Sequence, residues 1–151
     1  MIKVLFICHG NICRSPMAEF VMKALVKQQG LDEAYQIESA ATSTEEIGND
    51  IYPPARQCLR RHGIPFTHRR ARQVTPADYD AFDLLVIMEE YNRRNLQRII
   101  PRDPDGKVRT LLSFAGSQAD VADPWYTGDF EVAYRDILTG CQALLDQLEH
   151  K

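Results

Sequence analysis

The chain has 151 residues, 44% of them hydrophobic and 26% charged, with a formal net charge of −3. These fractions are typical of one globular domain and exclude a disordered or fibrous chain. The small negative charge gives no reason to expect nucleic acid or an anionic membrane as a partner, and the longest apolar runs, 4–8 and 84–88, are far too short to cross a bilayer.

The first ten residues, MIKVLFICHG, hold one basic residue and a short apolar run with no small-residue cleavage site after it. They predict a first strand rather than a signal peptide, and a cytoplasmic protein is the default expectation. The four cysteines, at 8, 13, 58 and 141, are expected to be reduced thiols there. Their spacing matches no zinc motif, so no metal site is predicted.

Strands and helices are predicted to alternate along the chain. Continuous apolar runs indicate buried strands, whereas an i, i+3, i+4, i+7 spacing of apolar residues indicates helices. A helix is predicted to start at Ser15 and to stop at Gly30, and a short one begins at Thr75 and Pro76. The other predicted helices are 53–62, 89–97 and 130–148, and the predicted strands are 2–8, 35–41, 83–88 and 109–114.

This alternation predicts an α/β fold, a doubly wound parallel sheet with helices on both faces. No repeat, low-complexity tract or linker divides the sequence, so a single domain over residues 1–151 is expected.

The segment between the first strand and the first helix, Cys8–Ser15, has an unusual composition. In open α/β sheets, ligands bind beyond the carboxyl ends of the strands. A loop of this length can curl so that successive backbone N–H groups face inward and bind an anion at the helix N-terminus. Gly10 permits a close backbone approach, and Asn11 tolerates the left-handed conformation. The loop lacks the Gly-Lys-Ser/Thr ending of a Walker loop.

A cysteine begins this loop and an arginine lies near its end. Arg14 can hold two phosphoryl oxygens with its planar guanidinium. The same positive charge and N–H groups favour the thiolate form of Cys8, to which Ser15 can donate a hydrogen bond. A lone cysteine at the end of a strand is usually only a small buried hydrophobic residue. The combination Cys-x5-Arg-Ser at a strand-to-helix junction favours a phosphate loop with a nucleophile.

The segment VLFICHGNICRSPMAEF, 4–20, resembles the signature C-x-G-N-x-C-R-S-P of the low-molecular-weight protein tyrosine phosphatases. The resemblance covers essentially the whole chain and implies a four-stranded parallel sheet, no cofactor and a phosphocysteine intermediate. It continues in the segments ESAATS at 38–43, RHGI at 61–64, HRRARQV at 68–74, IMEEYN at 87–92 and DPWYTGDFE at 123–131.

The resemblance also implies roles for single residues. Cys8 is the expected nucleophile, Arg14 binds the phosphoryl group, and Ser15 assists the thiolate as a leaving group. Asn11 is expected to support the loop, with Ser39 and His62 as its hydrogen-bond partners. The variable loop positions His9 and Ile12 would complete the mouth of the site.

A proton donor for the leaving group must come from a distant part of the chain. Asp123, followed by Pro124 and two aromatic residues, is the best candidate, although an Asp-Pro pair is more often only a turn. The resemblance implies that Asp123 is the general acid and then the general base. Trp125 and Tyr126 would line the cleft, with the alternative that they cover an edge of the core.

Three positions depart from the pattern of many relatives, which puts the substrate preference in question. Trp125 replaces a tyrosine, Glu45 replaces an aromatic residue, and Glu89 replaces an aspartate. Glu45 and Glu46 are expected to form part of the cleft wall.

Cys13 has two interpretations: a buried thiol that supports the helix start, or a resolving cysteine that captures oxidised Cys8 as a disulfide. The resemblance favours the second and implies reversible inactivation by peroxide. Cys58 and Cys141 lie on helical faces and are expected in the core. A basic stretch is read as a solvated face paired with acids, or as a surface that steers an acidic partner; it comprises Arg56, Arg60, Arg61, Arg69, Arg70 and Arg72.

The predicted function is therefore a protein tyrosine phosphatase that also hydrolyses small aryl phosphates. The expected partner is a phosphotyrosine-bearing protein, with phosphate and other oxyanions as inhibitors, and the expected state is a monomer or weak dimer. A thiol-dependent arsenate reductase would need further relay cysteines, which 87–101 does not contain. A protein-arginine phosphatase tends to have threonine in place of Ile12. A non-catalytic phosphate-binding module would not need Cys8, Arg14 and Asp123 together.

Overall fold

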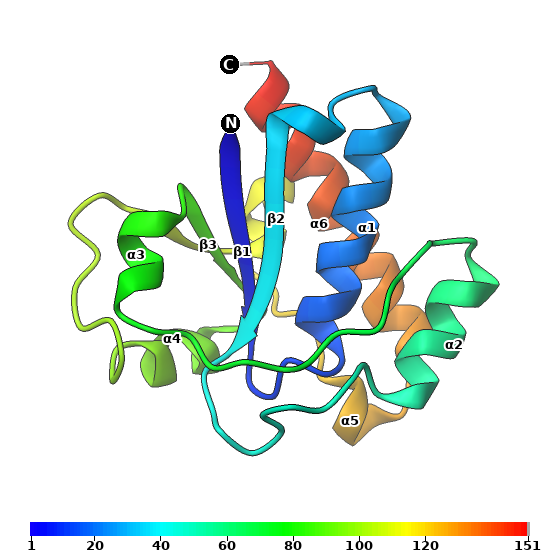
Figure 1. Ribbon diagram of the computed structural model, residues 1–151, viewed down its shortest axis with the longest axis horizontal. Helices are drawn as coiled ribbons and strands as arrows, with labels where there is room; N and C mark the ends of the chain where they lie inside the picture. Colours follow the sequence, from blue (N-terminus) through cyan, green and yellow to red (C-terminus); the bar gives the residue numbers. More distant parts are fainter. Residues whose placement is uncertain (151) are drawn as a thin grey trace.

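The computed structural model describes residues 1–150 and has an α/β architecture built on a parallel sheet (Figure 1). Four strands pair in the order β2-β1-β3-β4, and every pair is parallel. This confirms the predicted fold class. The strands are β1 (Ile2–Cys8), β2 (Tyr35–Ala41), β3 (Leu84–Ile87) and β4 (Val108–Thr110).

Helices cover both faces of the sheet, as predicted (Figure 1). One face carries α1 (Arg14–Gln28), α2 (Pro53–Arg61) and α6 (Phe130–Glu149), whereas the other carries α3 (Ala77–Ala81) and α4 (Glu90–Leu96). The short helix α5 (Pro124–Thr127) lies near the loop that joins β1 to α1. Two 3₁₀ helices, η1 (Asp32–Ala34) and η2 (Leu111–Ala115), complete the chain. Within residues 1–150, no helix has the length and apolar character needed to span a bilayer.

The central strand β1 explains why the first apolar run is continuous rather than alternating. Val4 and Phe6 face the core beneath α1 and α6, whereas Leu5 and Ile7 face the core beneath α3 and α4. All four side chains are fully buried. A strand that is buried on both faces needs apolar residues at every position.

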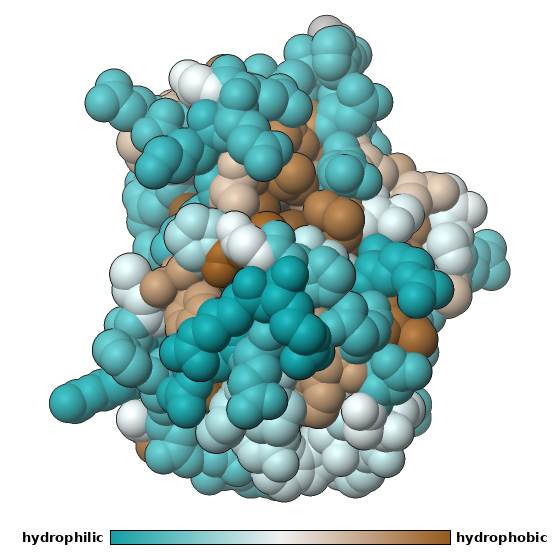
Figure 2. Space-filling view, turned by 90° about the vertical axis from the view of Figure 1, so that its right-hand side faces the viewer, coloured by the Kyte–Doolittle hydropathy of each residue, from teal (hydrophilic) through white to brown (hydrophobic). Residues whose placement is uncertain are grey.

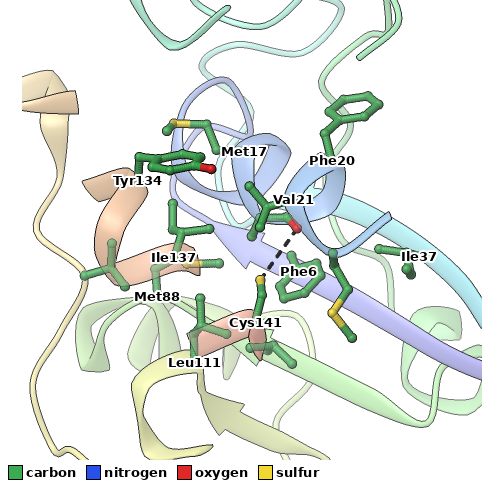
Figure 3. Close-up of a cluster of buried hydrophobic side chains, with 14 of the residues drawn as sticks. Phe6, Met17, Phe20, Val21, Ile37, Met88, Leu111, Tyr134, Ile137 and Cys141 are labelled. Atoms are coloured by element: carbon green, nitrogen blue, oxygen red, sulfur yellow. Dashed lines mark hydrogen bonds between the residues drawn. The ribbon is translucent and has the colours of Figure 1, made fainter. Parts of the chain in front are cut away.

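The largest hydrophobic core lies between the sheet and the helices α1 and α6 (Figure 3). There Cys141 donates a weak hydrogen bond from Sγ to the Ala18 carbonyl at 3.8 Å. Cys58 and Cys141 are both fully buried, which confirms the prediction for these residues. Burial raises the pKa of both thiols, that of Cys58 to about 11, so neither is a reactive thiolate at neutral pH.

The prediction of a last strand over 109–114 is wrong for most of its length. The strand ends at Thr110, and the chain then turns into the 3₁₀ helix η2. Leu111 and Leu112 both pack in the same core, whereas neighbouring residues of a strand point to opposite faces. The close approach of α6 makes this possible, because a Cβ on Gly140 would lie only 2.4 Å from Cγ of Leu111.

Candidate active site

The loop from Cys8 to Ser15 leaves the carboxyl end of β1 and leads into α1 (Figure 1). Its carbonyl groups accept hydrogen bonds from backbone N–H groups that surround the loop: Cys8 from Thr42 (3.0 Å), His9 from Ser43 (3.1 Å) and Ile12 from Tyr52 (2.9 Å). In a trans peptide the next N–H points away from the carbonyl. The N–H groups that follow these carbonyls are therefore turned toward the concave side, as in the predicted anion nest.

Asn11 stabilises the loop through its backbone conformation and its side-chain hydrogen bonds. Its φ of 59° lies in the left-handed region, and no other non-glycine residue of the described chain has a positive φ. The side chain is fully buried, and its Nδ2 donates to Oγ of Ser15 at 2.8 Å and to Oγ of Ser39 at 2.9 Å. Its Oδ1 accepts from the backbone N–H of Arg72 at 3.2 Å. The predicted partnership of Asn11 with Ser39 is confirmed.

These contacts fix the direction of the hydrogen bonds that lead to Cys8. Ser15 Oγ accepts from Asn11 and lies 3.0 Å from Cys8 Sγ, so its own proton is free for the sulfur. Ser39 likewise accepts from Asn11 and donates to Glu19 at 2.6 Å. Cys8 Sγ also accepts from the Asn11 backbone N–H at 3.3 Å. Two donors therefore converge on the sulfur, which favours a thiolate.

The expectation that His62 supports the loop is wrong. Its Nε2 bonds a carboxylate oxygen of Glu131 at 2.6 Å, and its ring stacks on Tyr134 at a centroid distance of 3.8 Å. Arg69 reaches the loop instead, and its Nη2 donates to the Asn11 carbonyl at 2.6 Å. Sequence reasoning missed this residue because it lies in the basic stretch, for which the expected contacts were solvent, nearby acids or an acidic partner.

Arg14 is 2% exposed at its side chain and is held on several sides. Its Nη1 lies 3.0 Å from a Glu89 oxygen and donates to the Val121 carbonyl at 2.9 Å, while its Nη2 lies 3.3 Å from Asp123. Burial opposes the charge, but the negative charges of Cys8, Glu89 and Asp123 outweigh it and raise the pKa of Arg14. The guanidinium is therefore a fixed cation beside the nucleophile.

Asp123 immediately precedes the four-residue helix α5, where no helix was predicted. Its Oδ1 accepts from the Trp125 backbone N–H at 3.1 Å, which caps the helix. The side chain is 21% exposed, so a substrate and water can reach it. Trp125 packs against Tyr52 with ring centroids 4.8 Å apart, whereas Tyr126 is 84% exposed. The position of the ring of Trp125 is thus set by the fold, and Tyr126 projects into solvent.

A single pocket brings the predicted nucleophile, arginine, acid and cleft walls together. It opens over the loop, where Nε2 of His9 pairs with Glu45 at 3.0 Å. Asn11, Ser15 and Ser39 are buried and do not line the pocket. The pocket is lined by Cys8, His9, Gly10, Ile12, Cys13, Arg14, Glu45, Glu46, Asp123, Trp125 and Tyr126.

Cys13 is a buried residue that also lines this pocket. Burial raises the pKa of its thiol, and the negative charges of Cys8 and Asp123 raise it further. Cys13 is therefore a neutral thiol beside a nucleophilic sulfur, which leaves Cys8 as the reactive cysteine of the loop.

One cluster of metal-ligating residue types lies outside the pocket. Cys58, His62 and Glu131 bring one ligand atom each to within 4.8 Å of one another, although no metal spacing was predicted. Hydrogen bonds from His62 and Arg61 lower the pKa of Glu131 to about 2. Since the Arg61 guanidinium lies 2.7 Å from the same carboxylate, its positive charge disfavours a divalent cation there.

The basic stretch is mostly paired, which favours the interpretation of a solvated face. Strongly hydrophilic side chains gather in the middle of the face that carries α1 and α2 (Figure 2). The pairs are Arg56 with Asp50 at 3.5 Å, Arg61 with Glu131 at 2.7 Å, Arg72 with Asp78 at 2.9 Å, and Arg60 over the ring of Phe66.

Comparison with known proteins identifies one family over almost the whole length. The family model "Low molecular weight phosphotyrosine protein phosphatase" matches residues 3–151. The low molecular weight protein-tyrosine-phosphatase YfkJ of Bacillus subtilis is 39% identical, with 99% of this chain and 97% of that protein covered. The human low molecular weight phosphotyrosine protein phosphatase is 41% identical, with coverage of 95% and 94%.

Solved structures agree with this result. The crystal structure of YfkJ superposes with a TM-score of 0.95, with 99% of this chain and 96% of that chain covered. The structure of Vibrio vulnificus Wzb in complex with benzylphosphonate has a TM-score of 0.84 at 28% identity, with coverage of 97% and 98%. Sequence, fold and pocket agree, and the chain therefore belongs to the low molecular weight phosphotyrosine protein phosphatase family and is a protein tyrosine phosphatase.

Proposed function

We propose that hydrolysis proceeds through a phosphocysteine on Cys8. In the first step the Cys8 thiolate attacks the phosphorus of a phosphotyrosine that is held by the loop N–H groups and by Arg14. The S–P bond forms as the P–O bond to the tyrosyl oxygen breaks. Asp123 gives its proton to that oxygen, so tyrosine leaves as a neutral phenol.

The second step returns the enzyme to its starting state. Water attacks the phosphorus of the phosphocysteine, and the Asp123 carboxylate takes the proton of the water. The S–P bond breaks, inorganic phosphate is released, and the sulfur leaves as a thiolate that accepts hydrogen bonds from Ser15 and Asn11. No redox step or cofactor enters this cycle.

The observation that carries the proposal is the convergence of three groups on one pocket. All three line the pocket, and Arg14 is ion-paired with Asp123 at 3.3 Å, so nucleophile, phosphoryl-binding cation and acid are within one small site. The benzylphosphonate complex of Wzb supports an aryl phosphate analogue as a ligand of such a pocket. We therefore expect inorganic phosphate and related oxyanions to inhibit competitively.

The cleft walls support phosphotyrosine as the substrate. Trp125 is anchored on Tyr52, so its ring offers an aromatic surface beside the loop. Ile12, where arginine phosphatases tend to have threonine, presents an apolar side chain in the pocket. An arsenate reductase relay would need accessible cysteines, and Cys58 and Cys141 are fully buried. The mechanism requires Cys8 in its reduced form, which favours the cytoplasm as the working compartment.

The experiment is phosphate release from a phosphotyrosine peptide, without metal or cofactor, by wild type and by Cys8→Ser. We expect turnover by wild type and none by the variant, whereas the matched control Cys58→Ser keeps activity if circular dichroism shows that it is folded. Phosphoarginine and phosphoserine peptides run beside it as competing substrates. Turnover by Cys8→Ser would refute the thiol mechanism, and binding without turnover by wild type would indicate a phosphate-reading module.

A further inference from the structure

Arg69 is a half-buried residue that contacts the back of the phosphate loop without lining the pocket. Its Nη2 donates to the Asn11 carbonyl at 2.6 Å, and its Nη1 donates to the Asn49 carbonyl at 3.3 Å. Its backbone N–H donates to Oδ1 of Asp50 at 3.3 Å. Through its side chain and its backbone, Arg69 thus connects the loop to the segment 49–50, which is distant in the sequence from both Asn11 and Arg69.

The contact with Asn11 controls the direction of one peptide group of the loop. Because the peptide is trans, a carbonyl of Asn11 that points at Arg69 turns the N–H of Ile12 to the opposite side, which is the concave side of the loop. Asn11 holds the left-handed φ of 59°, a conformation that costs energy for a residue with a side chain. A donor on the carbonyl stabilises this conformation over its flipped alternatives.

The charge of Arg69 acts on the same loop. Burial lowers its pKa, and the negative charges of Glu19, Cys8 and Asp50 act in the opposite direction. An arginine nevertheless remains protonated at neutral pH. Arg69 therefore adds a second positive charge near Cys8, besides that of Arg14.

The position of Arg69 is itself braced by Asp50. Burial opposes the charge of Asp50, but hydrogen bonds from His68, Ile51 and the Arg69 backbone outweigh it and lower its pKa to about 2. Asp50 is therefore ionised at neutral pH. The hydrogen bond from the Arg69 N–H to the Asp50 carboxylate therefore persists as the pH changes near neutrality.

We infer that Arg69 is a positioning residue of the catalytic loop. It holds the peptide group between Asn11 and Ile12 so that the Ile12 N–H faces the phosphate, and its charge stabilises the Cys8 thiolate. It acts through Asn11 and touches neither the substrate nor the reacting atoms. The inference rests on the proposed phosphocysteine mechanism. This role differs from both interpretations of the basic stretch, a solvated face and a surface that steers an acidic partner.

The experiment compares Arg69→Met, Arg69→Lys and the matched control Arg70→Met, which removes an exposed neighbouring arginine. The first readout is the pH midpoint of Cys8 alkylation by iodoacetamide, followed by mass spectrometry of the Cys8 peptide. We expect Arg69→Met to raise the midpoint by about 0.5–1.5 pH units, because one nearby charge is lost. Arg69→Lys keeps the charge and should restore the midpoint.

The second readout is the pH profile of kcat/KM on a phosphotyrosine peptide and the inhibition constant of inorganic phosphate. We expect Arg69→Met to lower kcat/KM by about 10- to 100-fold and to weaken inhibition by phosphate, since a misplaced N–H loses its contact with the oxyanion. Arg69→Lys should recover only part of kcat/KM, because an ammonium cannot reproduce the two contacts of the planar guanidinium.

If Arg69→Met had the alkylation midpoint and kcat/KM of Arg70→Met, the inference would be overturned. A purely structural role predicts lower thermal stability with an unchanged midpoint in the folded protein, which would also refute it. The alkylation readout needs no turnover. It therefore tests Arg69 even where the phosphatase assay of the proposed function fails.

Discussion

Replacement of Ser15 by alanine tests whether the oriented hydrogen bonds behind the loop serve the second chemical step. Ser15 Oγ lies 3.0 Å from Cys8 Sγ, and its proton is directed to the sulfur because Asn11 donates to the same oxygen. In the phosphocysteine the sulfur bears little charge, whereas it becomes a thiolate as the S–P bond breaks. The hydrogen bond therefore strengthens in the transition state of phosphoenzyme hydrolysis.

The structure sets the size of the effect. The sulfur has two donors, and the variant keeps the weaker one, the Asn11 N–H at 3.3 Å. A hydrogen bond to a charged group contributes about 1.5–3 kcal/mol, and about 1.36 kcal/mol corresponds to tenfold in rate. We therefore expect Ser15→Ala to slow phosphoenzyme hydrolysis by about 10- to 150-fold. Formation of the phosphocysteine should change much less, because the thiolate loses charge in that step.

Stopped-flow measurement with p-nitrophenyl phosphate separates the two steps. We expect a burst of one p-nitrophenol per active site, followed by a steady state that is slower than in wild type. Ser39→Ala is the matched control, because it removes a hydroxyl from the same chain of hydrogen bonds without touching the sulfur. Equal slowing of burst and steady state in Ser15→Ala, or no slowing of either, would show that the reasoning is wrong.

Three further predictions concern the acid, the second cysteine of the loop and the core. Asp123→Asn should lower kcat/KM, which reports formation of the phosphocysteine, by about 10²–10⁴-fold on a phosphotyrosine peptide and much less on p-nitrophenyl phosphate, because the better leaving group needs no proton; equal losses of kcat/KM on both substrates would exclude Asp123 as the acid. Peroxide should oxidise Cys8 to a sulfenic acid that condenses with the Cys13 thiol to a disulfide with release of water, whereas in Cys13→Ser excess peroxide should oxidise it further to sulfinic acid, so that added dithiothreitol restores activity in wild type but not in Cys13→Ser; equal recovery would contradict this role. Gly140→Ala should lower the free energy of unfolding by about 1–3 kcal/mol in urea titration, because its Cβ would meet Leu111 at 2.4 Å; a double variant with Leu111→Ala should lose less than the sum of the single losses, and simple additivity would argue against the clash.

Features that depend on neighbours in the sequence could be predicted, and most features of the site are of this kind. The spacing of Cys8, Arg14 and Ser15 and the left-handed conformation of Asn11 are set within one loop, where composition and local geometry are informative. The fold class likewise follows from apolar runs that alternate with helical periodicity. These predictions agree with the structure.

Features that depend on distant partners could not be predicted. The contact of Arg69 with the Asn11 carbonyl joins residues 58 positions apart, and the pairing of Arg14 with Glu89 joins residues 75 positions apart. The pattern at 109–114 is compatible with a strand, and only the close approach of Gly140 shows why the chain turns at Leu111. The assignment of His62 to the loop came from resemblance alone. Its actual hydrogen-bond partner is the carboxylate of Glu131, 69 positions away in the sequence.

The outward hydrogen bonds of the loop carbonyls have a thermodynamic consequence for ligand binding. The carbonyls of Cys8, His9, Asn11 and Ile12 already have protein donors, so the chain entropy of the loop is lost on folding and not when an oxyanion arrives. A receptor of this kind binds with little reorganisation, and small anions of similar size and charge share the same cradle. Phosphate, the product of the reaction, is one of them, so the rate at which phosphate leaves sets an upper limit on turnover.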